Sequence, residues 1–466
     1  MFPNKALSEL PLEIIDGDRG ANYPKTNEFS ARGHCLFLNA GNVSASGFSF
    51  SDTAFISEEK DQLLRKGKAQ RDDVILTTRG TVGNLALYDE SVPYEHVRIN
   101  SGMVLMRPDK IALDPEFLYY ALRSPAFSRQ VASLQTGSAQ PQLPIRDINH
   151  LRIPFPDLSN QKEVSKRVKL IFDKIELNRR MNETLEEMAR ALFRDWFVDF
   201  GPTRRQMEGA TDPAAIMGHA FPAGDMPAEV VTGSASGIST TKPLTAATLA
   251  PLFPAKLGDD GLPEGWKNSA LADRYKITIG RTPPRKEKWH FRSDGRGVPW
   301  LSIRDLGSSG AFAFNTAETL EESSVASCRV PVVKAETVLV SFKLTVGRVA
   351  IAANSMATNE AIAHLNPTEK SAPTEYTYAW MKQFDYGTLG STSSIANAVN
   401  SKTIRSMPIL CPGQALENAY SKVARRILAK VRANTEENQT LAALRDLLLP
   451  KLMSGEIRLK DAEACL

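Results

Sequence analysis

The chain has 466 residues, 42% of them hydrophobic and 24% charged, which is typical of a globular protein with more than one domain. A net charge of +4 permits nucleic acid as a partner without requiring one. The four cysteines form no CxxC pair and the six histidines show no metal-ligand spacing, so we expect neither a disulfide framework nor a metal site. No apolar run is long enough for a membrane span and no secretory leader is evident, so we expect a cytoplasmic protein.

The first region, residues 1–156, has the pattern of a mixed globular domain. Between Val74 and Gly83 the sequence predicts an apolar strand, a short turn with a basic residue, and a second strand that starts at Thr-Val-Gly. The region ends in an apolar strand, from Ile148 to Pro156, that closes with prolines. Because proline cannot occupy a helix interior, we expect a helix to begin just beyond this strand.

A long spacer helix is predicted over residues 157–208. From Val164 to Trp196, mostly apolar residues recur in alternating steps of four and three, which is the seam of a coiled coil. Asn178 and Asn182 interrupt this apolar seam. About forty helical residues at 1.5 Å each would form a rod of roughly 60 Å.

The last turns of this helix are unusually aromatic. The residues concerned are Phe193, Trp196, Phe197 and Phe200. They occupy more than one face of the helix, so two explanations remain open. An intrachain core is the ordinary one, and a docking surface for a partner subunit is the functional one. We take these four residues as the candidates for partner docking.

The second half of the chain repeats the first. Residues 209–262 are rich in Ala, Gly, Ser, Thr and Pro and are interpreted as a linker. A second globular region is predicted over 263–412, followed by a second spacer helix and a C-terminal tail over 413–466. The segment from Val338 to Gly347 repeats the strand, turn and strand of the first region at an offset of 264 (338 − 74).

Both seam asparagines recur in the second helix. Asn434 and Asn438 lie 256 residues after Asn178 and Asn182 (434 − 178 and 438 − 182). A chance match of a spaced apolar pattern with two coincident polar interruptions would be rare. The offset differs between the globular regions and the helices, which indicates loops of different length around the same order of strands.

These repeats predict an α+β fold with a pseudo-twofold internal repeat. Two similar mixed α/β globular domains would be separated by a long antiparallel two-helix coiled coil, because neither helix can bury its seam alone. Asn178 would then face Asn438, and Asn182 would face Asn434. Buried Asn pairs of this kind fix the register of two helices. A local polar defect is the alternative for any single Asn, and the duplication favours a register role.

The chain resembles, over nearly its whole length, the DNA-specificity subunit of a type I restriction–modification system. The stretches that carry the resemblance are Gly17–Pro24, Gly137–Gln142 before Leu151–Pro154, Leu192–Phe200 leading into Gly201–Arg204, Gly261–Trp266 and Thr282–Arg285. Each stretch alone is weak, but their order together with the duplicated helices is specific. The chain departs from the family pattern in its Ala/Ser/Thr-rich stretch around 210–245, which concerns the linker alone.

The resemblance implies a non-catalytic reader of DNA without a cofactor of its own. Such subunits bind a bipartite double-stranded DNA sequence, one half-site per recognition domain. Their helices fix the gap between the half-sites and recruit two adenine-methylating modification subunits, to which ATP-driven restriction subunits add. A rod of roughly 60 Å suits half-sites one to two turns of duplex DNA apart.

Candidate DNA contacts fall into two chemical groups. Arg and Lys in glycine- or proline-rich loops suit phosphates and guanine edges, and amides in flexible loops suit adenine edges. The candidates are Arg19, Lys25, Asn39, Asn42, Arg79, Arg98, Gln140 and Gln142 in the first region, and Arg281, Arg285, Lys286, Arg304, Lys343, Asn397 and Asn400 in the second. Any one of them has a solvated surface position as its alternative. Arg79 and Lys343 stand out because both occupy the same turn, whereas Asn100 and Asn359 open matching strands, where capping a turn is the alternative.

Two other classes of function remain as alternatives. A coiled-coil adaptor with protein-binding heads would assemble without regard to DNA sequence or salt. A self-contained modification enzyme is disfavoured, since the sequence has neither a G-x-x-x-x-G-K-[ST] phosphate loop nor an Asn/Asp-Pro-Pro-aromatic segment.

Overall fold

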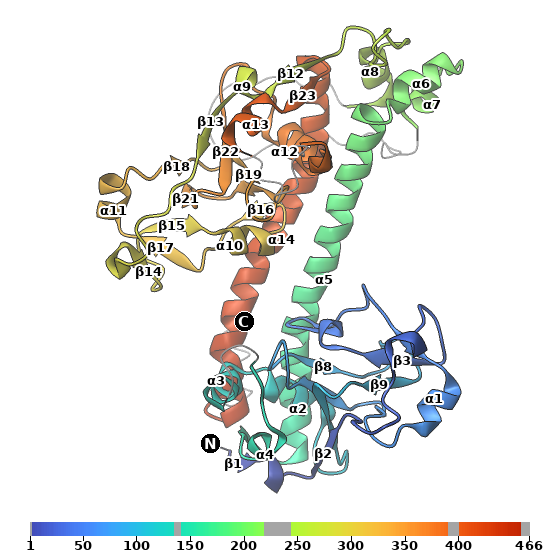
Figure 1. The fold of residues 1–466 in the computed structure, drawn as a ribbon, viewed down its shortest axis with the longest axis vertical. Coiled ribbons are helices and arrows are strands. Elements are labelled where there is room, and N and C mark those ends of the chain that lie inside the picture. The colour runs from blue at the N-terminus through green and yellow to red at the C-terminus, as the bar shows by residue number, and fades with distance from the viewer. Residues whose placement is uncertain (1, 135–140, 219–243, 390–399, 458–466) are drawn as a thin grey trace. The chain divides into compact units, whose positions relative to one another are not determined.

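The computed structural model describes residues 2–134, 141–218, 244–389 and 400–457. The chain divides into two units, unit 1 with Met1–Leu177 and Glu437–Leu466, and unit 2 with Asn178–Glu436. Two long helices, α5 (Leu158–Phe197) and α14 (Gln414–Ser454), each contribute residues to both units (Figure 1). In the described ranges, no helix is both long and apolar enough to cross a membrane.

Unit 1 contains a four-stranded antiparallel sheet in the order β2-β10-β7-β8 and a three-stranded sheet in the order β6-β3-β9. Its strands are β1 (Asn4–Ala6), β2 (Leu12–Asp16), β3 (Cys35–Leu38), β4 (Val43–Ser44), β5 (Gly47–Phe48), β6 (Phe55–Ile56), β7 (Val74–Thr77), β8 (Leu85–Leu87), β9 (Val97–Ile99), β10 (Met103–Pro108) and β11 (Arg152–Pro154). Its other helices are η1 (Leu7–Glu9), η2 (Thr26–Glu28), η3 (Ala40–Asn42), α1 (Glu58–Leu63), α2 (Pro115–Leu122), α3 (Pro125–Leu134) and α4 (Ile145–Ile148).

Unit 2 contains two five-stranded sheets, in the orders β13-β22-β19-β20-β16 and β14-β17-β15-β21-β18. Its strands are β12 (Lys267–Ala270), β13 (Tyr275–Ile279), β14 (Phe291–Arg292), β15 (Val298–Leu301), β16 (Phe312–Ala313), β17 (Glu318–Leu320), β18 (Val332–Val333), β19 (Val338–Ser341), β20 (Val349–Ala352), β21 (Met356–Thr358), β22 (Ile362–Pro367) and β23 (Pro408–Cys411). Its other helices are α6 (Gly201–Met207), α7 (Pro213–Met217), α8 (Ala246–Leu249), η4 (Ala250–Leu252), α9 (Leu271–Arg274), η5 (Lys288–His290), α10 (Ile303–Ser308), α11 (Glu322–Ser327), α12 (Thr374–Gln383), η6 (Tyr386–Leu389) and α13 (Ser401–Ser406).

The two units share the same strand pairing. In unit 1, Leu76 of β7 pairs with Val104 of antiparallel β10, and in unit 2 the equivalent Val340 pairs with Ala363. The only parallel pair of the three-stranded sheet, β3 with β9, recurs as β15 with β21. The predicted internal repeat is therefore confirmed down to the register of individual strands.

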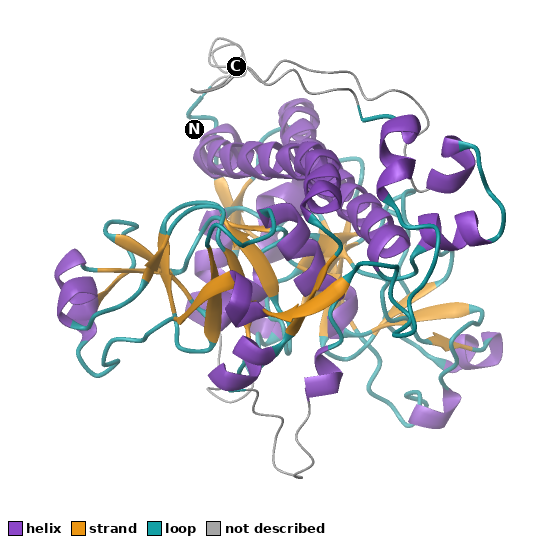
Figure 2. Ribbon diagram, turned by 90° about the horizontal axis from the view of Figure 1, so that it is seen from above, coloured by secondary structure: helices purple, strands orange, loops and turns teal. Residues whose placement is uncertain are grey.

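The central strands separate two packed layers, which explains their continuous apolar sequences. Val74 and Leu76 face a core that includes helical residues such as Val164, whereas Ile75 between them faces the three-stranded sheet. The same alternation holds in unit 2, where Leu339 faces the second sheet. In each unit α5 and α14 lie on one side of the strands (Figure 2).

One buried histidine joins the two sheets of unit 2. The imidazole of His364 on β22 hydrogen-bonds Thr278 of β13 at 2.9 Å and Thr358 of β21 at 2.7 Å. Burial lowers the pKa of His364 to about 4, so the ring is neutral at pH 7. A neutral ring can accept on one nitrogen and donate on the other, which satisfies both contacts.

The long helices pair in antiparallel fashion within each unit, as predicted. In unit 2 the hydroxyl of Tyr420 donates to the carbonyl of Ala189 at 3.2 Å, and Asn434 Nδ2 donates to Asn182 Oδ1 at 2.9 Å. In unit 1 Asn438 Nδ2 donates to the carbonyl of Ile175 at 3.2 Å. The predicted pairing of Asn182 with Asn434 is thus confirmed. The pairing of Asn178 with Asn438 would join the two units and stays a prediction.

The aromatic end of α5 lies in the core of unit 2, so its assignment to partner docking was wrong. Phe193, Trp196 and Phe197 are fully buried. Phe200 packs edge-on against Trp266, with ring centroids 5.7 Å apart. Trp196 likewise packs edge-on against Phe253, which lies near the end of the predicted linker. The chain returns to cover these side chains, a long-range contact that the helical pattern of α5 does not encode.

The spacer helix ends earlier than predicted. α5 stops at Phe197, Phe200 adopts a left-handed φ of 54°, and α6 starts in a new direction at Gly201. Pro202 is compatible with the break, because a proline is tolerated in the first turn of α6 but not in the interior of a helix that would run on from α5. The described ends of the predicted linker form α7 and α8, and residues 219–243 lie outside the described ranges.

We expect the Asn182→Leu variant to lose about 1–3 kcal/mol of stability, because it leaves Asn434 Nδ2 buried without its acceptor. The double variant Asn182→Leu with Asn434→Leu removes both amides and should be as stable as the natural chain or more so. Denaturant unfolding of the purified chain measures both changes. The single variant Asn434→Leu completes the comparison, and a loss in the double variant equal to the sum of the two single losses would contradict an energetic coupling of the pair.

Candidate nucleic-acid interface

The turn between β7 and β8 is held rigidly at one end of the four-stranded sheet of unit 1. The backbone N–H of Thr78 donates to the carbonyl of Gly102 at 2.7 Å, and that of Gly83 donates to the carbonyl of Thr77 at 3.0 Å. The Arg79 side chain is exposed, and no described residue forms a hydrogen bond or ion pair with its guanidinium. A rigid backbone therefore presents a cation whose hydrogen-bonding capacity is free for an external acceptor.

Two further segments lie against this turn. Asn84 Nδ2 donates to the carbonyl of Val43 at 2.8 Å, and the Thr81 hydroxyl donates to that of Ala40 at 3.4 Å, which brings the η3 loop alongside. The N–H of Leu143 donates to the carbonyl of Thr78 at 2.9 Å, and the backbones of Gln142 and Arg79 pair as an isolated antiparallel β-bridge. The structure thus brings together three of the predicted contacts, on residues 39, 79 and 142.

A third segment, residues 100–102, completes the surface. Asn100 Oδ1 accepts the N–H of Gly102 at 2.9 Å, so Asn100 caps a turn, which was the alternative to base contact. Arg19 donates to the carbonyl of Ser101 at 3.4 Å and pairs with Asp16 at 3.0 Å, while its side chain stays half exposed. A Cβ on Gly17 would lie 2.2 Å from the Asn100 carbonyl oxygen, so this close approach requires glycine. We call residues 17–19, 39–42, 78–84, 100–102 and 141–143 surface 1.

Unit 2 repeats this backbone frame at the turn between β19 and β20. Phe342 N–H donates to the carbonyl of Ala361 at 2.9 Å, as Thr78 does to Gly102, and Gly347 N–H donates to that of Ser341 at 3.0 Å. Asn359 Oδ1 accepts the N–H of Ala361 at 3.2 Å and caps the turn as Asn100 does. The same positions therefore form the same turns in both copies.

The η3 loop is replaced in unit 2 by α10. The guanidinium of Arg348 donates to the carbonyl of Ile303 at 2.7 Å and anchors this helix beside the turn. Arg304 on α10 is exposed, and its guanidinium has no partner among the residues that the structure describes. Lys343 is exposed at the turn itself. We call residues 280–282, 302–305, 342–348 and 359–361 surface 2.

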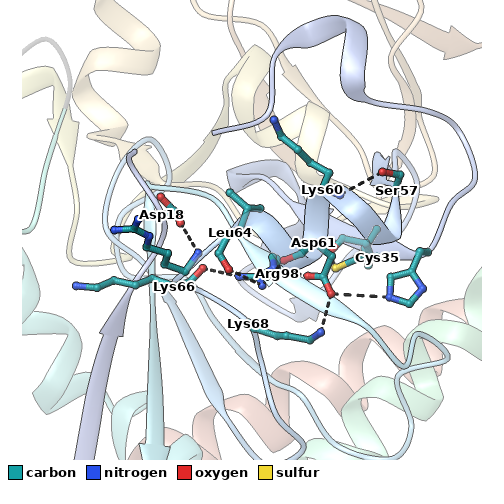
Figure 3. A network of polar contacts seen from close by, with 12 residues as sticks. Asp18, Cys35, Ser57, Lys60, Asp61, Leu64, Lys66, Lys68 and Arg98 are labelled. Atoms are coloured by element: carbon teal, nitrogen blue, oxygen red, sulfur yellow. Dashed lines mark hydrogen bonds and ion pairs between the residues drawn. The ribbon is translucent and has the colours of Figure 1, made fainter. Parts of the chain in front are cut away.

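Arg98 does not belong to surface 1, and we withdraw it from the DNA-contacting candidates. Its side chain is 5% exposed and donates to the Asp61 carboxylate, to the carbonyl of Lys66 at 2.7 Å and to that of Leu64 at 3.0 Å (Figure 3). Lys68 also binds Asp61, at 2.6 Å. A guanidinium that is buried and saturated with acceptors is structural.

The Arg98 network shifts the titration of its neighbours. Burial acts to raise the pKa of Asp61, but hydrogen bonds from Lys68 and Arg98 outweigh it and hold that pKa below its usual value. Burial next to the Asp61 charge raises the pKa of Cys35 to about 12. Cys35 is therefore an inert thiol at neutral pH.

Three other candidates also have structural roles. Asn42 is buried, and its amide donates to the carbonyls of Ser49 and Asp52 at 3.1 and 2.6 Å. Asn400 is the N-cap of α13, where its side chain accepts two backbone N–H groups. Arg285 stacks on the rings of Phe291 and Trp300 and binds both oxygens of Glu318 at 2.7 and 2.8 Å. These contacts engage the groups that a base edge would need.

The remaining candidates lie in exposed loops or outside the described ranges. Arg281 donates to the carbonyl of Cys328 at 2.8 Å, and Lys286 follows it in the loop before η5. Lys25 precedes η2 at the equivalent place in unit 1, and Asn39 caps η3 through Gly41. Gln140 and Asn397 fall in the ranges 135–140 and 390–399, which the structure does not describe. As far as the described chain extends, no group of His, Cys, Asp and Glu side chains could hold a metal ion.

Sequence analysis missed two residues of surface 2. Glu360 is exposed and accepts a hydrogen bond from the Thr282 hydroxyl, at the place where Arg19 meets Ser101 in unit 1. Leu344 lies at the tip of the turn beside Lys343. The signal was present in the alignment of the two halves, since Leu344 stands opposite Gly80 (344 − 264). The chemistry of DNA contacts favours cations and amides at such a turn, and neither an acid nor an apolar side chain fits that pattern.

We expect Arg79→Ala and Lys343→Ala to weaken duplex DNA binding on the order of tenfold each while leaving the melting temperature unchanged, because neither side chain holds the fold. Removing a phosphate contact should also make the slope of the logarithm of the binding constant against the logarithm of salt concentration shallower by about one. By contrast, Arg98→Ala should lower stability by about 3–5 kcal/mol, because it leaves the buried Asp61 charge without its main partner. Lys110→Ala, at the other end of β10, is the exposed control; equal binding losses in Lys110 and Arg79 variants would contradict surface 1.

Comparison with known proteins agrees with this repeated arrangement. A family model described as the type I restriction modification DNA specificity domain matches twice, over residues 12–187 and 263–440. The type I restriction enzyme HindI specificity subunit of Haemophilus influenzae is 27% identical over 459 residues, which cover 95% of this chain and 98% of that protein. The MjaIX specificity subunit of Methanocaldococcus jannaschii is 21% identical over 398 residues, 83% of this chain and 78% of that protein.

A solved structure shows the same fold. The S subunit of a type I restriction-modification system from M. genitalium matches with a TM-score of 0.51 at 13% identity, over 97% of this chain and 96% of that one. The family model covers both repeats and most of both long helices. The chain therefore belongs to the family of type I restriction–modification DNA specificity subunits.

Proposed function

We propose that the chain reads a bipartite double-stranded DNA sequence, one half with each recognition domain. The domain of residues 1–156 would use surface 1, and the domain of residues 263–412 would use surface 2. The observation that carries the proposal is one rigid backbone frame that occurs twice with different exposed side chains. The same docking geometry with different chemistry suits two different half-sites. The role is recognition, as in a specificity subunit, and catalysis belongs to other subunits.

The exposed side chains of the two surfaces favour different bases. Arg79 on surface 1 has the geometry for a guanine edge or a phosphate, and Asn39 beside it, whose Oδ1 caps η3, can donate from Nδ2 to an acceptor on a base edge. Lys343 and Arg304 supply positive charge on surface 2, while Glu360 can accept from the amino group of cytosine. An exposed carboxylate next to two cations argues against a purely phosphate-binding surface, because it would repel the backbone.

We propose that the paired helices set the gap between the half-sites. The 40 residues of α5 correspond to roughly 60 Å of helix, which is within reach of DNA sites one to two turns apart. The antiparallel contacts of both units hold the two helices in a single register. A fixed register gives the helix pair a fixed length, which is required if the helices are to set the gap between the half-sites.

We propose that two modification subunits dock on the helices, and that restriction subunits join the assembly through them. The apolar side chains that remain exposed support this. In unit 1, Leu170 and Leu177 of α5 are 66% and 54% exposed, and Leu447 of α14 is 59% exposed. Leu170 and Leu177 are seven residues apart and so lie on one face of the helix. Exposed leucines at heptad spacing are typical of a face that a further helix covers.

We expect Leu170→Glu combined with Leu177→Glu to abolish co-purification with the modification subunit, because it places two charges on the proposed docking face. Glutamate is a good helix former and both positions are exposed, so the fold should not change. Leu63→Glu is the matched control, since Leu63 is 55% exposed on α1, outside the long helices. Unimpaired co-purification of the double variant would place docking elsewhere.

We expect four residues inserted after Leu177, together with four after Glu436, to lengthen the recognised gap by about one or two base pairs, because four helical residues add roughly 6 Å. Mapping methylated adenines in cells that also contain the modification subunit measures the gap. The half-site sequences should stay the same, since neither surface is altered. The control is the same insertion between Gly295 and Arg296, in an exposed turn. An unchanged gap in the helix variant would contradict the proposal that the helices set the gap.

A further inference from the structure

The turn of surface 2 carries an apolar side chain that the fold does not use. Leu344 is 89% exposed at the tip between β19 and β20. Its φ is 65°, in the left-handed region, and the N–H of Thr345 donates to the carbonyl of Lys343 at 2.8 Å across it. This is a three-residue turn of the rare kind with a positive central φ. Leu344 thus combines a strained backbone with an apolar side chain that is almost wholly exposed in the free protein.

The equivalent turn of unit 1 avoids the strain. Gly80 occupies the same place with a φ of 74°, which glycine adopts at no steric cost. The frame therefore accepts glycine, and a leucine in surface 2 is not required by the backbone. The side chain itself must account for its presence.

The other residues with positive φ have local explanations. Asp72 and Glu336 occupy one matched turn before β7 and β19, and their N–H groups donate to the carbonyls of Tyr88 and Ala352, both at 2.8 Å. Phe200 packs on Trp266, and Arg329 lies at the C-terminal end of α11, where its N–H donates to the carbonyl of Ala326 at 3.2 Å. In the part of the chain that the structure describes, only Leu344 combines a left-handed backbone with an apolar side chain that is almost wholly exposed.

The neighbours of Leu344 are the charged groups of surface 2. Lys343 is adjacent in the turn. Arg304 lies on α10, which Arg348 anchors beside the turn through Ile303. Glu360 precedes Ala361, whose carbonyl accepts the N–H of Phe342 at 2.9 Å. An apolar tip framed by charges at this position would meet the DNA wherever surface 2 does.

We propose that Leu344 makes an apolar contact with the bases of the half-site read by unit 2. The inference rests on the proposed reading function and deepens it, since surface 1, with Gly80, cannot make this contact. Leucine gains nothing from hydrated phosphates, whereas bases offer two apolar targets. One is the methyl group of thymine, and the other is the space between stacked base pairs, into which apolar wedges insert. Burial against DNA would offset the strain and the exposure together.

The test compares Leu344→Gly and Leu344→Asn with the natural chain, each as the full chain assembled with its modification subunits on its mapped target. Both variants tolerate the left-handed backbone, and asparagine also keeps most of the side-chain volume. We expect each to bind the target on the order of tenfold more weakly, with an equal or higher melting temperature. Ile111→Gly is the control, because Ile111 is 84% exposed in the loop beyond β10, outside both surfaces, and the variant should bind normally.

Two DNA substitutions identify the kind of contact. If Leu344 meets a thymine methyl, one thymine-to-uracil change in the second half-site will weaken the natural chain as much as Leu344→Gly does, and will have no further effect on the variant. If Leu344 is a wedge, 2-aminopurine at one position of that half-site will brighten when the natural chain binds and not when the variant binds. Either result supports the proposal.

Two results overturn it. One is binding of Leu344→Gly and Leu344→Asn that equals the natural chain, and the other is weaker binding with neither the methyl nor the unstacking signature. Both differ from a failure of the proposed function itself, in which the natural assembly would not discriminate its target from unrelated DNA.

Discussion

Each long helix carries an apolar seam that it cannot bury alone, and this constraint organises the whole chain. Unit 1 is complete only when the last turns of α14 join it, because Leu448, Leu449 and Leu452 share a core with Val164 and Val168 at the start of α5. Residues nearly 300 positions apart (452 − 164) must therefore meet before unit 1 reaches its final packing. Loop closure over such a distance is slow, which favours prior folding of the more local strand pairs.

The helical core in turn holds the sheets that present the reading turns. Alternate residues of β7 and β19 point to the helices and to the smaller sheet, so the strands are fixed on both faces. The turns at their ends inherit that rigidity through backbone hydrogen bonds that are the same in both units. Side chains on the turns make few of these bonds. Surface chemistry can thus differ between Arg79 and Lys343, or between Gly80 and Leu344, without disturbing the frame that holds it.

The sequence predicted those features that depend on local or periodic patterns. The seam positions, the duplicated asparagines and the shared turn of Arg79 and Lys343 all follow from spacing alone. It could not predict features that depend on a distant partner. Arg98 looked like a loop cation because its acceptor, Asp61, is 37 residues away and the burial of both is a tertiary property. Trp196 and Phe197 looked available for docking because the rings that cover them, Phe253 and Trp266, lie at the end of the predicted linker and just beyond it.

The polar seam shows that register takes precedence over stability in the helix pair. Asn434 Oδ1 is buried and accepts no hydrogen bond from any described residue, which a leucine at that position would avoid. A shift of one helix along the other would break the Asn182–Asn434 bond and also strip the buried Tyr420 hydroxyl of its acceptor at Ala189. Unit 1 imposes the same register independently, through Asn438 on the Ile175 carbonyl and Lys174 with Glu437 at 3.3 Å. Four polar contacts on two units therefore oppose any slip. A change of length in one helix alone would set the contacts of one unit against those of the other, so a new spacing requires matched changes in both helices.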